Sequence, residues 1–123
     1  MLLAYTPDLL VRSRIDLAAT HYAVETAHVA SDEQFAARVA EVGPRLELIL
    51  IDLDREGTDA VAVIEAAKAA APQARVVGFC SHVMTDLIRD ARRAGADQVL
   101  PNSTFMAGIP GLLAVLKDHR RGE

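Results

Sequence analysis

The segment Gly78-Phe79-Cys80-Ser81-His82 gathers a thiol, a hydroxyl and an imidazole, which are the groups that act as nucleophile and base in many hydrolases. It departs from the G-x-S-x-G elbow because His82 stands where the sharp turn requires the last glycine. Adjacent Ser81 and His82 would also point in different directions, so a dyad of these two is not expected. Cys80 ends an apolar run, where a cysteine acts as a small core residue. We therefore predict that this protein is not an enzyme and has no catalytic residues.

Cysteine and histidine content excludes other kinds of chemistry. The single cysteine, Cys80, rules out a disulfide framework and a cysteine-based zinc site, and it favours a reducing, cytoplasmic location. The four histidines show neither H-x-x-x-H nor H-x-x-E-H spacing. No apolar stretch approaches the roughly 20 residues of a membrane span, so we expect no membrane partner.

Length and charge set the scale of the protein. Its 123 residues correspond to a single domain, 1–123, large enough to bury a core without staples. Thirteen basic residues against seventeen acidic residues give a net charge of −4, which argues against a nucleic-acid partner. The basic set contains eleven arginines and only two lysines, Lys68 and Lys117.

Hydrophobic patterning predicts five strands that alternate with five helices. The run Leu46–Asp52 is apolar on both faces, which is typical of a central strand of a parallel sheet. Ser31 and Gln34 have capping-box form at the start of the second helix, and Thr58 is expected to cap the third. The expected strands are 2–5, 22–27, 46–52, 75–80 and 97–100, and the expected helices are 9–18, 31–42, 58–71, 85–94 and 110–121.

Such a short alternation of strand and helix predicts an α/β fold: a doubly wound, five-stranded parallel sheet of flavodoxin-like (βα)5 topology with strand order 2-1-3-4-5. A ligand site in this fold lies beyond the carboxyl ends of the strands. The residues at those ends are Thr6, Pro7 and Asp8; 52–57; Cys80, Ser81 and His82; and Pro101, Asn102 and Ser103.

Two segments give the chain a resemblance to the receiver domains of bacterial response regulators (CheY-like) over essentially its whole length. Ile49-Leu50-Ile51-Asp52-Leu53 is similar to the strand that ends in a phospho-accepting aspartate. The run from Ala91 to Leu100, with Gly95-Ala96-Asp97 at its centre, is similar to the lead into the last strand. The resemblance implies a signalling module of two-component or phosphorelay type.

Five positions carry the chemistry of that family, and this chain has the family's residue type at only some of them. The phosphoacceptor falls on Asp52, which is present. The acid pair falls on Thr6 and Pro7, so it is absent, and Asp8 lies one position later. The position of the switch hydroxyl falls on Cys80 or Ser81, and that of the lysine falls on Asn102.

These losses bear directly on phosphorylation. Phosphorylating a carboxylate needs Mg²⁺, which requires oxygen ligands in near-octahedral geometry. Asp52 would hold Mg²⁺ nearly alone, with Asp8 or Asp54 as weak additional ligands, and we expect no other cofactor. Asn102 offers a neutral amide where the family has a positive charge. We therefore interpret the chain as a phosphorylation-independent pseudo-receiver; the alternative is an atypical receiver that is phosphorylated on Asp52.

A protein partner is the expected mode of action. Arg89, Arg92 and Arg93 form a basic stretch on the fourth helix, and the resemblance places the usual partner surface on the fourth helix, fifth strand and fifth helix. Arg92 or Arg93 could pair with Asp97 or Asp118 of a second copy in a homodimer through this face.

A flavin, cobalamin or other small-ligand domain is the less favoured alternative from a different class. The sequence lacks a phosphate-binding loop rich in Ser, Thr and Gly after the first strand, and it lacks D-x-H-x-x-G.

Overall fold

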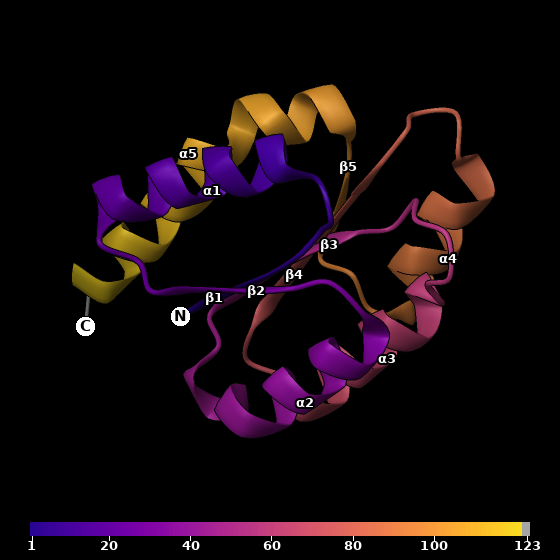
Figure 1. Cartoon of the computed structure of the whole chain (residues 1–123), viewed down its shortest axis with the longest axis horizontal. Helices are drawn as coiled ribbons and strands as arrows, with labels where there is room; N and C mark the ends of the chain where they lie inside the picture. The colour runs from indigo at the N-terminus through magenta and orange to yellow at the C-terminus, as the bar shows by residue number, and fades with distance from the viewer. Residues whose placement is uncertain (122–123) are drawn as a thin grey trace.

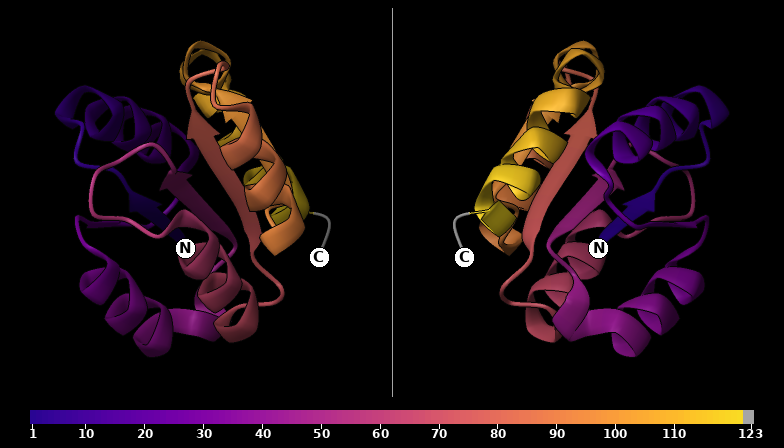
Figure 2. Two further views of the ribbon diagram at one scale, coloured as in Figure 1. Left: turned by 90° about the vertical axis from the view of Figure 1, so that its right-hand side faces the viewer. Right: turned by 90° about the vertical axis from the view of Figure 1, so that its left-hand side faces the viewer.

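Strand β3, Leu48–Asp52, lies in the middle of a five-stranded sheet whose spatial order is β2-β1-β3-β4-β5. Every pairing is parallel, so the carboxyl ends of the strands meet at one edge, and Figure 2 shows the arrowheads pointing the same way. The predicted doubly wound sheet and its strand order are confirmed. The other strands are β1 (Leu2–Tyr5), β2 (Thr26–Val29), β4 (Arg75–Cys80) and β5 (Gln98–Pro101).

Helices cover both faces of the sheet in the computed structural model, which describes the backbone of residues 1–121 and the side chains of residues 1–116. In Figure 1, α1 and α5 lie on one face, and α2, α3 and α4 lie on the other. No helix within residues 1–121 combines the length and the apolar character needed to cross a membrane. The helices are α1 (Leu9–Tyr22), α2 (Asp32–Val42), α3 (Ala60–Ala70), α4 (Thr85–Ala94) and α5 (Asn102–Arg121), with a 3-10 turn η1 (Gly43–Arg45) after α2.

Two apolar clusters, one on each face, hold the layers together. Alternate residues of β3 point to opposite faces, so Ile49 and Ile51 pack under α2 and α3, and Leu48 and Leu50 pack under α1 and α5. The rings of Phe79 and Phe105 stack at 3.9 Å between centroids and join β4 to α5. This packing fixes the strand ends relative to the helices around them.

The first helix continues beyond its predicted end, and the second strand begins later than the expected 22–27. Tyr22 is the last residue of α1, and Ala23 ends the helix in the left-handed conformation, with φ of 55°. The N–H of Val24 then bonds to the carbonyl of Ala19 at 2.9 Å. Glycine is the usual residue at such a cap. Because alanine takes its place here, the helix end carried no sequence signal.

The last helix begins at Asn102 rather than near Pro110, which lies inside it. Proline lacks a backbone donor and is expected in a first turn rather than a helix interior. The buried residues Phe105, Ile109 and Leu113 are spaced by four and continue one apolar face across Pro110. Burial of this face outweighs the lost hydrogen bond.

Two predicted caps differ in detail from the structure. Ser31 caps α2 as predicted, because its hydroxyl accepts from the N–H of Gln34 at 3.1 Å. The Gln34 side chain accepts from the N–H of Ala30 rather than from that of Ser31. Asp59, not Thr58, caps α3 through the N–H of Ala62. As a result, α2 begins one residue and α3 two residues after the predicted start.

Asp97 connects the start of β5 to the start of β4. Its Oδ2 accepts from the N–H of Val76 and lies 2.7 Å from Nζ of Lys68. Its own N–H donates to the carbonyl of Val76 at 2.8 Å. Burial raises the pKa of Asp97, but the Lys68 ammonium and the Val76 amide outweigh it, so the net pKa lies below the usual value.

We predict that Asp97→Ala lowers the free energy of unfolding by about 1–3 kcal/mol at neutral pH, because the Val76 amide loses its acceptor. Because folding lowers the pKa of Asp97, its ionised carboxylate stabilises the fold at pH values above the ordinary carboxyl pKa. This contribution is lost as the pH falls through the pKa of the folded state. Urea unfolding should therefore show a smaller difference from the wild type at acidic pH. Glu41→Ala, which removes an exposed carboxylate paired with Arg38, is the matched control; an equal loss there would contradict the assignment.

Candidate functional site

The Asp52 carboxylate lies at the carboxyl end of β3 and accepts two hydrogen bonds. Thr6, directly after β1, donates its hydroxyl to Oδ2 at 3.1 Å. The N–H of Asp54 donates to Oδ1 at 3.3 Å. Thr6 is completely buried, and Asp52 is half-buried. The ends of β1 and β3 are thus joined through a neutral donor and a carboxylate.

Asp8 stands beside this pair but is engaged by a helix. Its N–H donates to the Thr6 hydroxyl at 3.2 Å. Its Oδ1 accepts from the N–H groups of Leu10 and Val11 at 2.9 and 3.2 Å, and Asp8 therefore caps α1. One chain of hydrogen bonds runs from Asp52 through Thr6 to the start of α1.

A cavity of about 320 Å³ opens over Asp52. It brings together Asp8, Asp52, Asp54 and Asn102, four of the predicted site residues, and contains no lysine or arginine among the described residues that line it. The predicted candidates Cys80 and Ser81 do not line it. The remaining lining residues are apolar: Leu10, Val11, Phe79, Phe105 and Met106.

Asp8 and Asp54 are the other carboxylates that line the cavity with Asp52, and their oxygens are the ones that could bind a cation there. Oxygen ligands suit Mg²⁺, but the ion needs several of them in near-octahedral order. In the part of the chain with described side chains, no group of three or more His, Cys, Asp or Glu residues is placed to hold a metal ion. Both carboxylates would have to reorient to share an ion with Asp52.

Burial dominates the electrostatics of Asp52. Desolvation raises the pKa of its carboxyl above the usual value. The hydrogen bonds from Thr6 and the Asp54 amide and the charge of Arg55 oppose this rise, whereas the charge of Asp54 adds to it. The donors around Asp52 therefore compensate only part of the cost of burying its charge.

Cys80 and Ser81, the two candidates for the switch hydroxyl, lie outside the lining of this cavity. Cys80 ends β4 fully buried, and burial, followed by the charges of Asp54 and Asp52, raises the pKa of its thiol. Such a thiol stays protonated and is a poor nucleophile. The Ser81 hydroxyl accepts a long hydrogen bond from the N–H of Val83 at 3.5 Å, and Met84 is the residue that precedes α4.

Arg55 is a residue near the site that sequence reasoning missed. Its Nε donates to the carbonyl of Asp52 at 3.0 Å, and its guanidinium lies 3.6 Å from the centre of the Tyr5 ring. Tyr5 belongs to the α2 and α3 face of the sheet, whereas the cavity lies on the α1 and α5 face. The sequence signal that could have revealed Arg55 is its position three residues after Asp52, beyond the end of the strand. The only cation in this loop is therefore directed away from the cavity.

The residues predicted to contact a partner protein differ in whether they are exposed or already paired within the chain. Arg92 and Arg93 are exposed on α4. Arg89 forms ion pairs with Asp86 and Asp90 of its own helix, at 3.4 and 3.3 Å. Asp97 is already paired with Lys68 within the chain. The side chain of Asp118 lies outside the described residues.

No protein-family profile and no curated protein sequence matches the chain, but many solved structures match its fold. A CheY-like receiver domain protein from Methanospirillum hungatei JF-1 superposes with a TM-score of 0.80 at 13% identity, over 98% of this chain and 95% of that one. The receiver domain of NtrX from Brucella abortus gives 0.77 at 19%, over 95% and 97%. The beryllofluoride-activated NtrC4 receiver domain dimer gives 0.73 at 16%, over 92% and 95%.

The fold is that of a response regulator receiver domain. Thr6, to which the sequence resemblance assigns the first acid, lies beside Asp52 and donates a hydrogen bond to it. Asn102, to which the sequence resemblance assigns the lysine, is the first residue of α5 and lines the cavity. The assignment of the family's acid and lysine positions to Thr6 and Asn102 stays a prediction from the sequence.

We predict that Asp52→Asn stabilises the protein at neutral pH. Because folding raises the pKa of Asp52, its protonated carboxyl contributes fully to stability below the ordinary carboxyl pKa of about 4. This contribution is lost as the pH rises through the pKa of the folded state. Replacement by the neutral amide removes the cost of the buried charge. Thermal unfolding should show the gain at pH 7 and its disappearance at acidic pH.

Asp54→Asn removes an exposed carboxylate two residues away and serves as the control for a change in net charge. Its gain should be smaller than that of Asp52→Asn. Equal gains would mean that general charge repulsion, not burial of Asp52, causes the effect.

Proposed function

We propose that this chain is a non-enzymatic, receiver-like signalling module of two-component type that acts through protein–protein contacts and is not switched by an aspartyl phosphate. One observation carries the proposal: the Asp52 carboxylate accepts a hydrogen bond from the neutral Thr6 hydroxyl in a cavity whose described lining holds three carboxylates and no cationic side chain. The similarity to receiver domain structures supports the signalling class.

The charge balance of the cavity explains why phosphorylation is disfavoured. A phosphoryl group on Asp52 would add a charge of about −1.5 to −2 beside Asp8 and Asp54. Mg²⁺ and a basic side chain normally stabilise such charge during phosphoryl transfer. Asn102 supplies at most an amide, and the Arg55 guanidinium lies over Tyr5 on the other face of the sheet. The cavity therefore repels the group that a receiver must accept.

We predict that incubation with acetyl phosphate and Mg²⁺ leaves the protein unmodified. In the reaction that would modify it, an Asp52 oxygen attacks phosphorus, the bond to the acetyl oxygen breaks and acetate leaves. Intact-mass spectrometry would show the product as a gain of about 80 Da for one phosphoryl group. An authentic receiver domain, treated in parallel, shows that the reagent is active.

Asp52→Asn locates any modification that does occur. A mass gain that is present in the wild type and absent from this variant would place the phosphate on Asp52 and overturn phosphorylation independence. A gain that persists in the variant lies elsewhere in the chain and leaves the proposal intact.

An atypical receiver that is phosphorylated on Asp52 is the second candidate function. It is favoured by the placement of Asp8 and Asp54 in the same cavity as Asp52, where their carboxylates could complete a Mg²⁺ site.

Titration with Mg²⁺, followed by amide NMR, separates the two candidates. We expect no saturable shifts of the amide signals at Asp8, Asp52 and Asp54 at millimolar Mg²⁺. Saturable shifts at these amides that disappear in Asp52→Asn would support the second candidate.

A further inference from the structure

Helix α1 exposes three leucines among polar residues on the face turned away from the sheet, in addition to the apolar residues that pack against the sheet. Val11, Ile15 and Ala18 are buried against the sheet and α5. Leu9, Leu10 and Leu17 are 76%, 61% and 69% exposed. They are three of the five exposed large apolar side chains among the residues whose side chains are described. Large apolar side chains gathered on an exposed helix face favour a contact surface.

The exposed residues of α1 follow a heptad pattern. Leu10 and Leu17 are seven residues apart, and the exposed Ser13 and Thr20 each follow three residues later. This spacing gives the alternating a and d positions of a coiled-coil seam, with leucine at a and small polar residues at d. Leu9 and Asp16 then occupy the g positions on one flank, and Arg14 and His21 occupy the e positions on the other.

The charges on the two flanks decide what can pair with this seam. In a parallel pair of identical helices, each g residue faces the e residue five positions later on the other copy. The second carboxylate oxygen of Asp16, whose Oδ1 is bonded to His28 of its own chain, then faces His21 of a second copy. The stem of Arg14 covers Leu9 of the second copy. An antiparallel pair instead brings like flanks together, so that the Arg14 side chains approach each other. The seam is complementary to itself in the parallel orientation.

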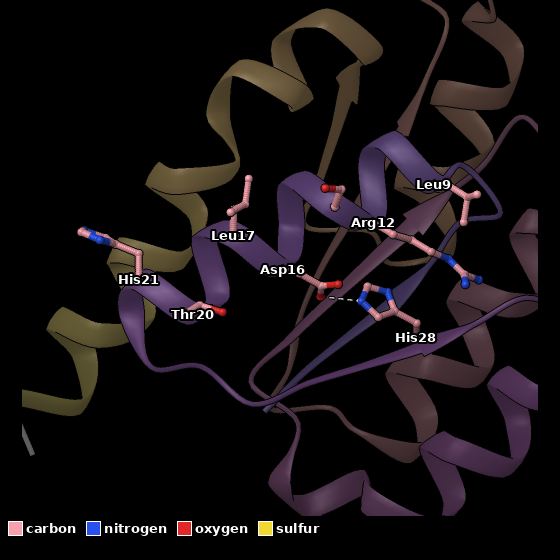
Figure 3. Close-up of a pocket in the computed structure, with 8 residues that line it drawn as sticks. Leu9, Arg12, Asp16, Leu17, Thr20, His21 and His28 are labelled. Atoms are coloured by element: carbon pink, nitrogen blue, oxygen red, sulfur yellow. Dashed lines mark hydrogen bonds and ion pairs between the residues drawn. The ribbon is translucent and has the colours of Figure 1, made fainter.

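The surroundings of α1 leave this seam accessible. Figure 3 shows Leu17 pointing away from the hydrogen-bonded Asp16 and His28, on the side of the helix away from β2. Leu17 and His21 also border a groove of about 420 Å³ between α1 and α5, which Met106 and Pro110 line from the other side. Because α1 is already folded on the domain, pairing costs no helix formation.

We propose that the protein forms a homodimer through parallel pairing of α1 with α1 of a second copy, along the seam of Leu10, Ser13, Leu17 and Thr20. The alternative face, on α4, has a different character. Its exposed side chains include Asp86, Arg89, Arg92 and Arg93, whereas Leu87 and Ile88 pack against the core. The apolar contact needed to bury a stable interface is therefore on α1.

The first test is the oligomeric state of the full chain, measured by sedimentation velocity over a roughly hundredfold dilution. The wild type should be dimeric at high concentration. Leu17→Glu should weaken the dimer by about tenfold or more, because a carboxylate would be buried at the seam. Val115→Glu, at a position on α5 that is 52% exposed, should leave the dimer unchanged. Circular dichroism checks that both variants are folded.

Disulfide trapping tests the orientation. Parallel pairing in register brings each seam position next to itself, so Ser13→Cys and Thr20→Cys should each form a covalent dimer under mild oxidation. In an antiparallel pair centred near Ser13, the two copies of residue 20 would be about 20 Å apart. Arg92→Cys on α4 is the control, and the native Cys80 is fully buried.

Each result decides the proposal. Dimerisation that is lost in Leu17→Glu, together with trapping at both seam positions, supports it. A wild type that is monomeric at every concentration overturns it, as does a dimer that is indifferent to Leu17→Glu. Trapping at Arg92→Cys with none on α1 would assign the interface to α4. None of these results depends on the phosphorylation of Asp52.

Discussion

Burial of β3 on both faces is the constraint from which the rest of the structure follows. Residues 48–51 are at most 1% exposed, so helices must cover the sheet on each side. Asp52 is the first residue at which this strand meets solvent. It is consequently only half desolvated, and the raised pKa of its carboxyl follows from its place in the strand. The position of the site is thus a result of how the core is built.

The sequence was most informative where burial is periodic. Residues 46–52 indicated the central strand because they are apolar on both faces, and the strand order followed from the alternation of strands with helices. Ala23 and Pro110 misled in opposite ways: alanine ended a helix in a conformation that favours glycine, and proline lay inside a helix it was expected to begin. Tertiary packing outweighed the local preference at both positions.

The composition of the site was predictable, but its hydrogen bonds were not. Parallel strand ends meet at one edge, which brought Asp8, Asp54 and Asn102 to Asp52 as expected. Thr6 had been counted as a missing acid, yet it donates to Asp52. The place of Arg55 over the Tyr5 ring depends on a loop conformation that no spacing rule gives. Side-chain direction in loops is set by such contacts, and it decides here where the positive charge lies.

The site and α1 are physically connected. Asp8 caps α1 with one carboxylate oxygen, and its backbone N–H bonds to the hydroxyl that Thr6 directs at Asp52. Leu10 lines the cavity and also belongs to the exposed seam of α1. A ligand or partner that pulls Asp8 toward Asp52 would remove the cap and unsettle the first turn of α1, because caps contribute about 0.5–2 kcal/mol to helix stability. Pairing along α1 would in turn hold that turn in place and restrict movement at the mouth of the cavity. Such coupling requires no phosphate, since it uses only the hydrogen bonds that already join Asp52, Thr6 and Asp8.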